Sequence, residues 1–380
     1  MRPIRVCIIS PLGYGLYHPG SGQPFGGAEV QCFLLATTLS ADPAFDVSVL
    51  TTVNHEGGVQ QLDHVKLIAR VGKRRVGPDG AGTFLGYASA FAEMYRTLGS
   101  VDADVYLHAG AGVEVGAYAL ICRLLRRRFI FIVASSGDLL AHPPNVHGPL
   151  RWLYPMGLRL ADAIVCRAAE QQAALRTKIA SEGILIRSGH ALPPAGASPR
   201  PDKSTILWVG RMHPLKQPEL FLDLAARLPK ERFVMVAAHD EAQPALHGRI
   251  LDRASRLSNV TMREDAPWSD VGRYFEEAKL FVNTSTYEGF PNTFVQAAIQ
   301  GVPILSWKVD PDHVLAERRI GTCADGSFER LVAATEEFCD NEPLRIEFGR
   351  RATAYARAYH DLACTTAQFK ELIRRVTRCR

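Results

Sequence analysis

Short apolar runs alternate, along the first half of the chain, with longer segments in which apolar residues recur every three or four positions. The short runs predict strands over residues 4–10, 47–51, 65–69, 105–108, 129–134, 163–166 and 184–187. The longer segments predict amphipathic helices over residues 28–40, 83–98, 113–126, 149–160 and 168–179. Strands that alternate with helices in this way indicate a parallel sheet built from βαβ units.

The same alternation resumes after a proline-rich segment. Residues 188–203 contain four prolines and lack apolar periodicity, so they predict a linker. Beyond this segment we expect strands over residues 205–209, 233–237, 260–263, 279–283 and 303–306, and helices over residues 218–228, 268–277, 293–300, 328–339, 344–359 and 362–376. The pattern therefore predicts an α/β protein with two parallel-sheet domains, at residues 1–187 and 204–359, and a C-terminal segment at residues 360–380.

The composition is that of a folded globular protein. The 380 residues are 47% hydrophobic and 22% charged, which suits two domains of ordinary size. No run of about 18 apolar residues occurs, so no membrane-spanning helix is expected. Residues 1–6 enter a strand at once, without the apolar core of a signal peptide. The eight cysteines are scattered and form no Cys-x-x-Cys pair, so we interpret them as reduced core residues of a cytoplasmic protein.

The net charge of +5 is modest, but arginines gather in two places. One group is Arg123, Arg126, Arg127 and Arg128, and the other is Arg374, Arg375, Arg378 and Arg380. Two interpretations stay open: solvated helix ends, or a surface that touches anionic lipid at the inner face of a membrane. Nucleic acid is not an expected partner, because no recognition motif occurs and aromatic residues do not interleave with the arginines.

The most informative stretch is residues 282–303. An apolar strand runs into a polar turn that carries Glu288, Gly289 and Pro291, and a helix follows from Thr293. A carboxylate and a helix N-terminus thus meet at the carboxyl end of a strand, where ligands bind in open α/β sheets. Backbone amides suit a phosphate and the carboxylate suits hydroxyl groups. The turn therefore predicts a site for a phosphorylated, hydroxyl-rich ligand.

Two cations are predicted at the same edge of the second sheet. A strand ends at Gly210, and Arg211 and Lys216 follow it. Two cations in a cleft can neutralise a diphosphate as it leaves. The alternative is a surface loop with two solvated cations.

The first domain offers weaker candidates. A glycine-rich loop that ends in Gly26 and Gly27 follows the first strand, and it lacks the Gly-x-Gly-x-x-Gly spacing of dinucleotide sites. His108, Ser136 and Asp138 follow two further strands. Asp138 either bonds sugar or acceptor hydroxyls or caps a turn, and His108 is either a ligand contact or a buried, satisfied histidine.

Residues 282–303 also resemble the signature of retaining nucleotide-sugar glycosyltransferases of GT-B architecture, the group 1 or family four glycosyltransferases. That signature has one acid, seven residues and a second acid; here Glu288 matches the first, and Gln296 stands in place of the second. The resemblance implies two Rossmann-like domains that face a cleft, with the helix at residues 362–376 crossing back onto the first domain.

The resemblance also implies roles for the candidate residues. Glu288 contacts the donor sugar, Gln296 meets the ribose through an amide that both donates and accepts, and Arg211 and Lys216 hold the diphosphate. The remaining donor-binding positions are Gly289, Phe290, Asn292 and Thr293 in the turn, and Gly26 and Gly27 facing the diphosphate. Many relatives carry a histidine after the strand at residues 129–134; here Ser136 and Asp138 are the polar candidates.

The expected activity is therefore transfer of a hexose from a nucleotide-diphosphate sugar to a hydroxyl of a glycan or lipid-linked acceptor, with retention, in bacterial polysaccharide or glycolipid assembly. No cofactor beyond the donor and no metal is expected, because no zinc-spaced cluster occurs and the cations already serve the leaving group. Two alternatives stay open. One is a GT-B epimerase or phosphorylase, and the other is a non-catalytic nucleotide-sugar-binding subunit, which Gln296 and the missing histidine would suit.

Overall fold

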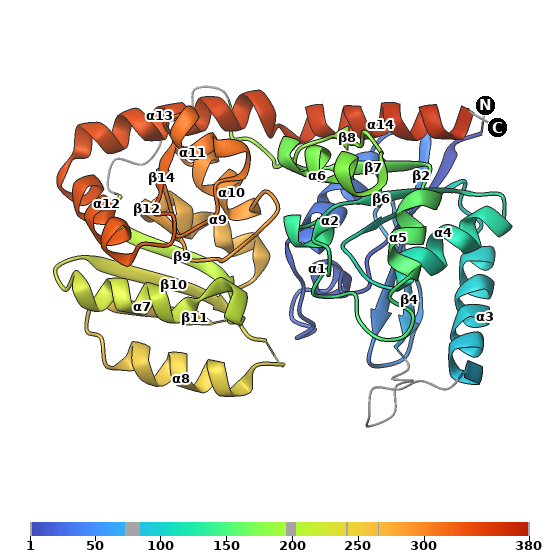
Figure 1. The fold of residues 1–380 in the computed structure, drawn as a ribbon, viewed down its shortest axis with the longest axis horizontal. Helices are drawn as coiled ribbons and strands as arrows, with labels where there is room; N and C mark the ends of the chain where they lie inside the picture. The colour runs from blue at the N-terminus through green and yellow to red at the C-terminus, as the bar shows by residue number, and fades with distance from the viewer. Residues whose placement is uncertain (1, 73–83, 195–202, 241, 265, 379–380) are drawn as a thin grey trace. The chain divides into compact units, whose positions relative to one another are not determined.

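The computed structural model describes residues 2–72, 84–194, 203–240, 242–264 and 266–378. It divides the chain into two compact units (Figure 1). The first unit consists of Met1–Gly189 together with Leu362–Arg380, and the second consists of His190–Asp361. The predicted linker at residues 188–203 falls partly outside the described residues, because 195–202 are not among them.

The first unit is an eight-stranded sheet with helices on both faces. Its strands are β1 (Ile4–Ile9), β2 (Phe45–Val53), β3 (Gly58–Leu62), β4 (Val65–Val71), β5 (Val105–Ala109), β6 (Arg128–Ile132), β7 (Ala163–Cys166) and β8 (Ile184–Leu185). Its helices are α1 (Tyr14–Tyr17), α2 (Gly27–Ser40), α3 (Phe84–Val101), α4 (Glu114–Leu124), the 3-10 helix η1 (Ser136–Leu139), α5 (Leu153–Leu160), α6 (Ala169–Ile179) and α14 (Leu362–Arg378). The strand order is β3-β4-β2-β1-β5-β6-β7-β8, and every neighbouring pair is parallel except β3 with β4.

The central strand β1 shows how the sequence builds two cores. Val6 and Ile8 face one side of the sheet, where they share a core with α2 and with Phe369 and Ile373 of α14. Cys7 faces the other side, where α4 and α5 cover it. Alternate side chains of a strand point to opposite faces, so a run buried on both faces is apolar throughout.

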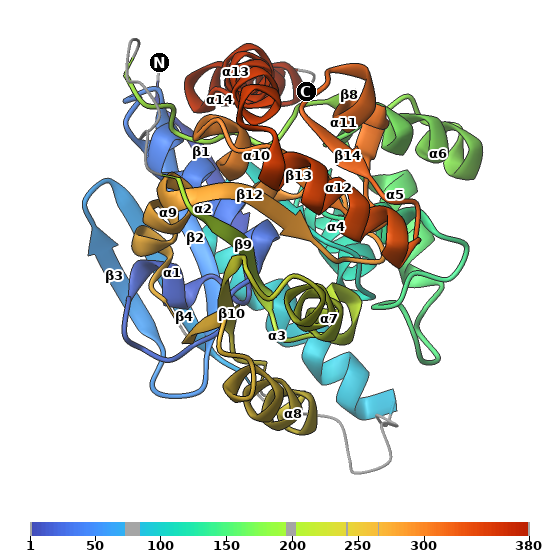
Figure 2. The same ribbon diagram turned by 90° about the vertical axis from the view of Figure 1, so that its left-hand side faces the viewer.

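The second unit is a six-stranded parallel sheet. Its strands are β9 (Thr205–Arg211), β10 (Arg232–Ala238), β11 (Val260–Glu264), β12 (Ala278–Asn283), β13 (Ile304–Ser306) and β14 (Gly321–Cys323). Its helices are η2 (Pro214–Lys216), α7 (Pro218–Arg227), α8 (Pro244–Ser255), α9 (Trp268–Glu277), α10 (Asn292–Ile299), η3 (Pro311–His313), α11 (Val314–Glu317), α12 (Phe328–Asp340) and α13 (Glu342–Tyr359). The strand order is β11-β10-β9-β12-β13-β14, and Figure 2 shows β12 and β10 on either side of β9. The predicted α/β class with two parallel sheets is confirmed.

Several elements differ from the prediction, which also did not include α1, α11 or β14. The antiparallel edge strand β3 is mostly exposed and polar, so it lacks the apolar run that marks a buried strand. No helix is predicted over residues 244–255, although Leu246, Ile250 and Ala254 recur every four residues and are the buried positions of α8. Residues 149–152 precede α5 rather than forming its first turn.

Candidate active site

The carboxyl ends of β9 and β12 bring charged side chains to one edge of the second unit. Arg211 is the last residue of β9, and Lys216 ends η2 just beyond it. Glu288 lies in the loop between β12 and α10. Because β9 and β12 are neighbours in a parallel sheet, the loops that follow them meet at the same edge.

Lys216 and Glu288 form an ion pair at this edge. The Lys216 Nζ contacts the Glu288 Oε1 atom, and the Ser285 hydroxyl donates a hydrogen bond to the same oxygen at 2.8 Å. The Lys216 side chain is 32% exposed and the Glu288 side chain 18%, so solvent and ligands reach both. Arg211, which is half-buried, makes no ion pair with any described residue.

A buried hydroxyl holds the two loops together. Thr284 is fully buried; its Oγ1 atom accepts a hydrogen bond from the Trp208 indole N–H at 2.8 Å and donates to the backbone carbonyl of Lys216. The Thr286 amide donates to the carbonyl of Leu215 at 3.0 Å. These bonds fix the backbone that carries Lys216 against the loop that carries Glu288.

The helix α10 begins four residues after Glu288. No side chain of the described residues caps its N-terminus, and its first turn holds no acidic residue, so the positive end of the helix dipole is not neutralised locally. Asn292, its first residue, bonds the side chain of His190, and burial lowers the pKa of His190 to about 4, so this imidazole is neutral at pH 7. Thr293 is half-buried in the same turn.

The other predicted donor-binding residues divide into buried core positions and partly exposed ones. Gly289 and Phe290 are buried, and the Phe290 ring packs 4.6 Å from the His360 ring, so the Phe290 side chain belongs to the core. Gln296 lies one turn further along α10, is half-buried, and makes no side-chain hydrogen bond to a described residue.

The glycine-rich loop of the first unit leads into α2. The Gly26 amide donates to the Glu29 carboxylate at 2.9 Å, which caps this helix, and Gly27 is its first residue. Within the loop, a β-carbon on Gly15 would lie 2.3 Å from the Gln23 carbonyl oxygen, so only glycine fits there. The loop is therefore shaped by close backbone contacts.

The polar candidates of the first unit are held by internal contacts. The His108 ring is buried with Nδ1 2.9 Å from the carbonyl of Ile9, and burial lowers its pKa. Asp138 is buried and accepts hydrogen bonds from the amides of Ala134 at 2.9 Å and Ser135 at 3.1 Å, which is the geometry of a turn cap. Burial raises the pKa of Asp138 to about 6, against the opposing effect of these amides. The Ser136 hydroxyl donates to Glu170 at 3.0 Å.

The fold and part of the second unit resemble known proteins. Residues 203–341 match the family described as Glycosyl transferases group 1. The chain superposes on a sucrose-phosphate synthase from Thermosynechococcus elongatus with a TM-score of 0.78 and 16% identity, over 99% of this chain and 100% of that one. The chain therefore has the GT-B fold, and its residues 203–341 are similar to group 1 glycosyltransferases.

Other GT-B relatives support the same placement. Anabaena Alr3699/HepE, solved in complex with UDP and glucose, matches with a TM-score of 0.72 and 15% identity over 97% of this chain and 99% of that one. In sequence, the D-inositol 3-phosphate glycosyltransferase of Paenarthrobacter aurescens (strain TC1) is 25% identical over 185 residues, which is 46% of this chain and 45% of that protein. The match thus spans less than half the length of this relative.

Ion pairs account for part of the arginine clusters in this GT-B protein. Arg127 pairs with Asp102, and Arg128 pairs with Asp162 at 2.7 Å. Arg374 lies 3.8 Å from Asp42 and stacks over a phenylalanine ring, while Arg380 lies outside the described residues. None of the described helices is both long enough and apolar enough to span a membrane.

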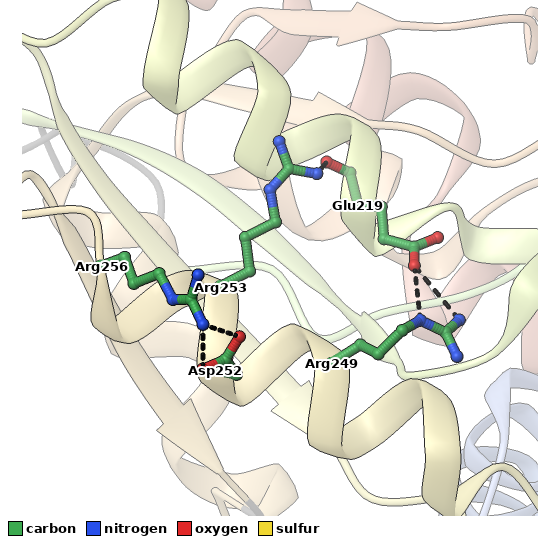
Figure 3. A pocket seen from close by; sticks show the side chains of 5 residues that line it. All are labelled: Glu219, Arg249, Asp252, Arg253 and Arg256. Atoms are coloured by element: carbon green, nitrogen blue, oxygen red, sulfur yellow. Dashed lines mark hydrogen bonds and ion pairs between the residues drawn. The ribbon is translucent and has the colours of Figure 1, made fainter.

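A charged hollow of about 510 Å³ between α7 and α8 is lined by none of these candidates (Figure 3). Its lining residues are Glu219, Arg249, Asp252, Arg253 and Arg256. Each arginine already has a carboxylate partner: Glu219 for Arg249, Asp252 for Arg256, and Asp223 for Arg253. Across the described part of the chain, no group of three or more His, Cys, Asp or Glu side chains is arranged to hold a metal ion.

Thr284 and Ser285 contribute to the site although they are not among its predicted residues. Both lie inside the informative stretch, and Ser285 precedes Glu288 by three residues, the spacing at which a serine and an acid commonly bond across a turn. That spacing is the signal that marks Ser285. No local signal marks the Thr284 bond, because its partners Trp208 and Lys216 are 76 and 68 residues away in sequence.

Proposed function

We propose that this protein transfers a hexose from a nucleotide-diphosphate sugar to a hydroxyl acceptor with retention of the anomeric configuration. The observation that carries the proposal is the Lys216–Glu288 ion pair beside Arg211 and the uncapped N-terminus of α10. One carboxylate, two cations and helix amides are the groups that a sugar joined to a diphosphate requires.

The ion pair supports a simple exchange on donor binding. The diphosphate takes the place of Glu288 at the Lys216 ammonium and also engages Arg211. Glu288 is then released to accept hydrogen bonds from sugar hydroxyls, with Ser285 still holding one of its oxygens. This exchange costs little free energy, because a partly exposed ion pair stabilises the fold by only about 0–1 kcal/mol. In this proposal Gln296, one turn along α10, binds the ribose hydroxyls.

In the proposed reaction the bond between the anomeric carbon and the diphosphate oxygen breaks, and a bond from the acceptor oxygen to that carbon forms on the same face. The acceptor proton passes to the departing diphosphate, so no separate protein base is required. Lys216, Arg211 and the α10 dipole stabilise the negative charge that develops on the diphosphate.

The acceptor belongs to the same proposal. The Paenarthrobacter relative is named for D-inositol 3-phosphate and the Thermosynechococcus structure for sucrose phosphate. We therefore place polyol phosphates and sugar phosphates first among the acceptors to test, followed by glycan and lipid-linked hydroxyls of bacterial polysaccharide and glycolipid assembly.

A thermal-shift panel of UDP, GDP, ADP and dTDP sugars, each with and without EDTA, tests donor binding. One nucleotide sugar should raise the melting temperature, since a ligand that binds only the native state stabilises it. That donor is then incubated with the acceptors, and the product is examined by proton NMR for its anomeric configuration. No stabilisation by any donor, or an inverted product, would refute the proposal.

The same binding and turnover measurements separate the rival functions. A transferase releases nucleoside diphosphate in proportion to the acceptor supplied. An epimerase instead changes the sugar of the donor without an acceptor, and a binding subunit stabilises with the donor but turns none of it over.

A further inference from the structure

A buried arginine of the first unit is not one of the candidate site residues. Arg167 directly follows β7, and only 6% of its surface is exposed. Its backbone amide donates to the Gln171 side chain at 2.7 Å, which fixes the residue at the start of α6. Burying a guanidinium removes it from water, and such groups are therefore normally paired with an anion.

The charge of Arg167 has no counter-charge among the described residues. Its Nη1 atom donates to the carbonyls of Ile186 at 3.0 Å and Arg187 at 3.2 Å, and its guanidinium lies 5.4 Å from the centre of the Phe369 ring of α14. No described carboxylate forms an ion pair with it. Burial lowers the pKa of Arg167 to about 10, so the side chain remains a cation at pH 7.

The titratable side chains close to Arg167 do not supply the missing charge. They are the thiols of Cys32 and Cys166 and the basic side chain of Arg187, which lines the same cavity. Burial raises the pKa of Cys32 to about 12 and that of Cys166 to about 11, so both thiols are neutral at pH 7.

A small cavity adjoins this guanidinium. Its volume is about 10 Å³, the size that holds one water molecule or one small ion. The residues that line it include Arg167, Arg187, Gln31, Gly189, Thr365, Thr366 and Phe369.

Among these residues the Thr366 hydroxyl is a donor that a bound ion could use. Its Oγ1 atom is buried without a hydrogen-bond partner in the described part of the chain, and the residue is 2% exposed. Gln31 is already committed, because its amide exchanges two hydrogen bonds with the Gly189 backbone. The Thr365 hydroxyl donates to the carbonyl of Leu362 at 3.1 Å.

We propose that this cavity binds a single monatomic anion, chloride in the cell, between the Arg167 guanidinium and the Thr366 hydroxyl. A water molecule would satisfy the hydroxyl but leave the buried charge uncompensated, whereas a halide accepts from both groups and neutralises the arginine. Phosphate and carboxylates exceed the cavity. The anion joins the start of α6 to α14 and so secures the last helix on the first unit. This site is independent of the proposed transferase activity.

The test measures the melting temperature as sodium gluconate is replaced by sodium chloride at constant ionic strength. Gluconate is too large for the cavity, so the melting temperature should rise with chloride and then saturate, and bromide should act alike. Arg167→Met should abolish the chloride dependence. Arg176→Met removes an exposed arginine of α6 and should retain it, which controls for general salt effects.

Thr366→Val keeps the shape of the side chain and should raise the half-saturating chloride concentration about tenfold, because one hydrogen bond to the ion is lost. This variant keeps the test decisive if Arg167→Met fails to fold. Equal melting temperatures in chloride and gluconate, or an unchanged chloride dependence in both cavity variants, would show that the cavity holds only water.

Discussion

Lys216 and Lys279 provide a matched test of the candidate active site, because each forms an ion pair with a glutamate of the second unit. Lys279 lies near the amino end of β12 and pairs with Glu231. Lys216 pairs with Glu288, which follows the carboxyl end of the same strand. The two pairs share their chemistry and differ in which end of the strand they occupy.

The expected losses of stability run in the opposite order to the expected losses of activity. The Lys216 side chain is 32% exposed, so Lys216→Ala should lower the free energy of unfolding by about 1 kcal/mol or less, a shift of roughly 2–4 °C at most. The Lys279 side chain is 12% exposed and that of its partner 24%, so Lys279→Ala leaves a less solvated carboxylate and should lose about 2 kcal/mol.

Activity should respond only to Lys216. Loss of one charge-assisted contact to the developing diphosphate charge should lower kcat about 10²–10³-fold in Lys216→Ala. Lys279→Ala should keep the kcat and the donor affinity of the parent protein. The assay is nucleoside diphosphate release at saturating acceptor, alongside thermal unfolding of each variant. The reasoning is refuted if the two variants lose activity in proportion to their melting temperatures.

Three further predictions concern Thr284, two glycines and Asp138. Thr284→Val leaves the Trp208 indole N–H without its acceptor and should lower the free energy of unfolding by about 1–3 kcal/mol. It should also lower the affinity for the sugar donor. Thr284→Ser keeps the hydroxyl and should restore that affinity in a titration; if it does not, the hydroxyl does not support the site as inferred. Gly349→Ala places a β-carbon 2.3 Å from a backbone oxygen and should destabilise by about 1–3 kcal/mol, whereas Gly248→Ala, in open space on α8, should stabilise by about 0.5–1 kcal/mol; equal denaturation midpoints would contradict this. Because the pKa of Asp138 is raised to about 6 in the folded state, protonated Asp138 stabilises the fold fully below its unfolded pKa near 4, and this stabilisation of roughly 3 kcal/mol is lost as pH rises through 6. Urea titrations from pH 4 to 7 should show this fall in the free energy of unfolding for the parent protein and not for Asp138→Asn. The same pH dependence in both proteins would exclude this role of Asp138.

Much of the fold follows from the sequence, because strands buried on both faces are apolar throughout and their helices repeat every three to four residues. The contact of Lys216 with Glu288 is also accessible to this reasoning. Loops after neighbouring parallel strands share one edge, so the strand pattern predicts that the two residues meet. Strand β3 could not be predicted in this way. Its exposed polar residues pair through backbone atoms, and backbone pairing alone produces no apolar pattern of side chains.

Long-range contacts set the limit of what the sequence predicts. Nothing local distinguishes Asp138 as a turn cap from Asp138 as a ligand contact; the choice depends on the amides that the fold brings to it. Arg167 is a sharper case. A charged residue after a strand is ordinarily solvated, and this one is covered by Phe369, some 200 positions later in the chain.

The composition of the first unit has a consequence for how the protein is made. Its core includes Phe369, Leu372 and Ile373 of α14, which leave the ribosome after the whole of the second unit. The apolar face of the first unit that α14 covers therefore stays exposed until α14 has been synthesised. The second unit, whose residues are contiguous, can fold before then. Folding during synthesis thus reverses the usual order, in which the N-terminal domain is completed first.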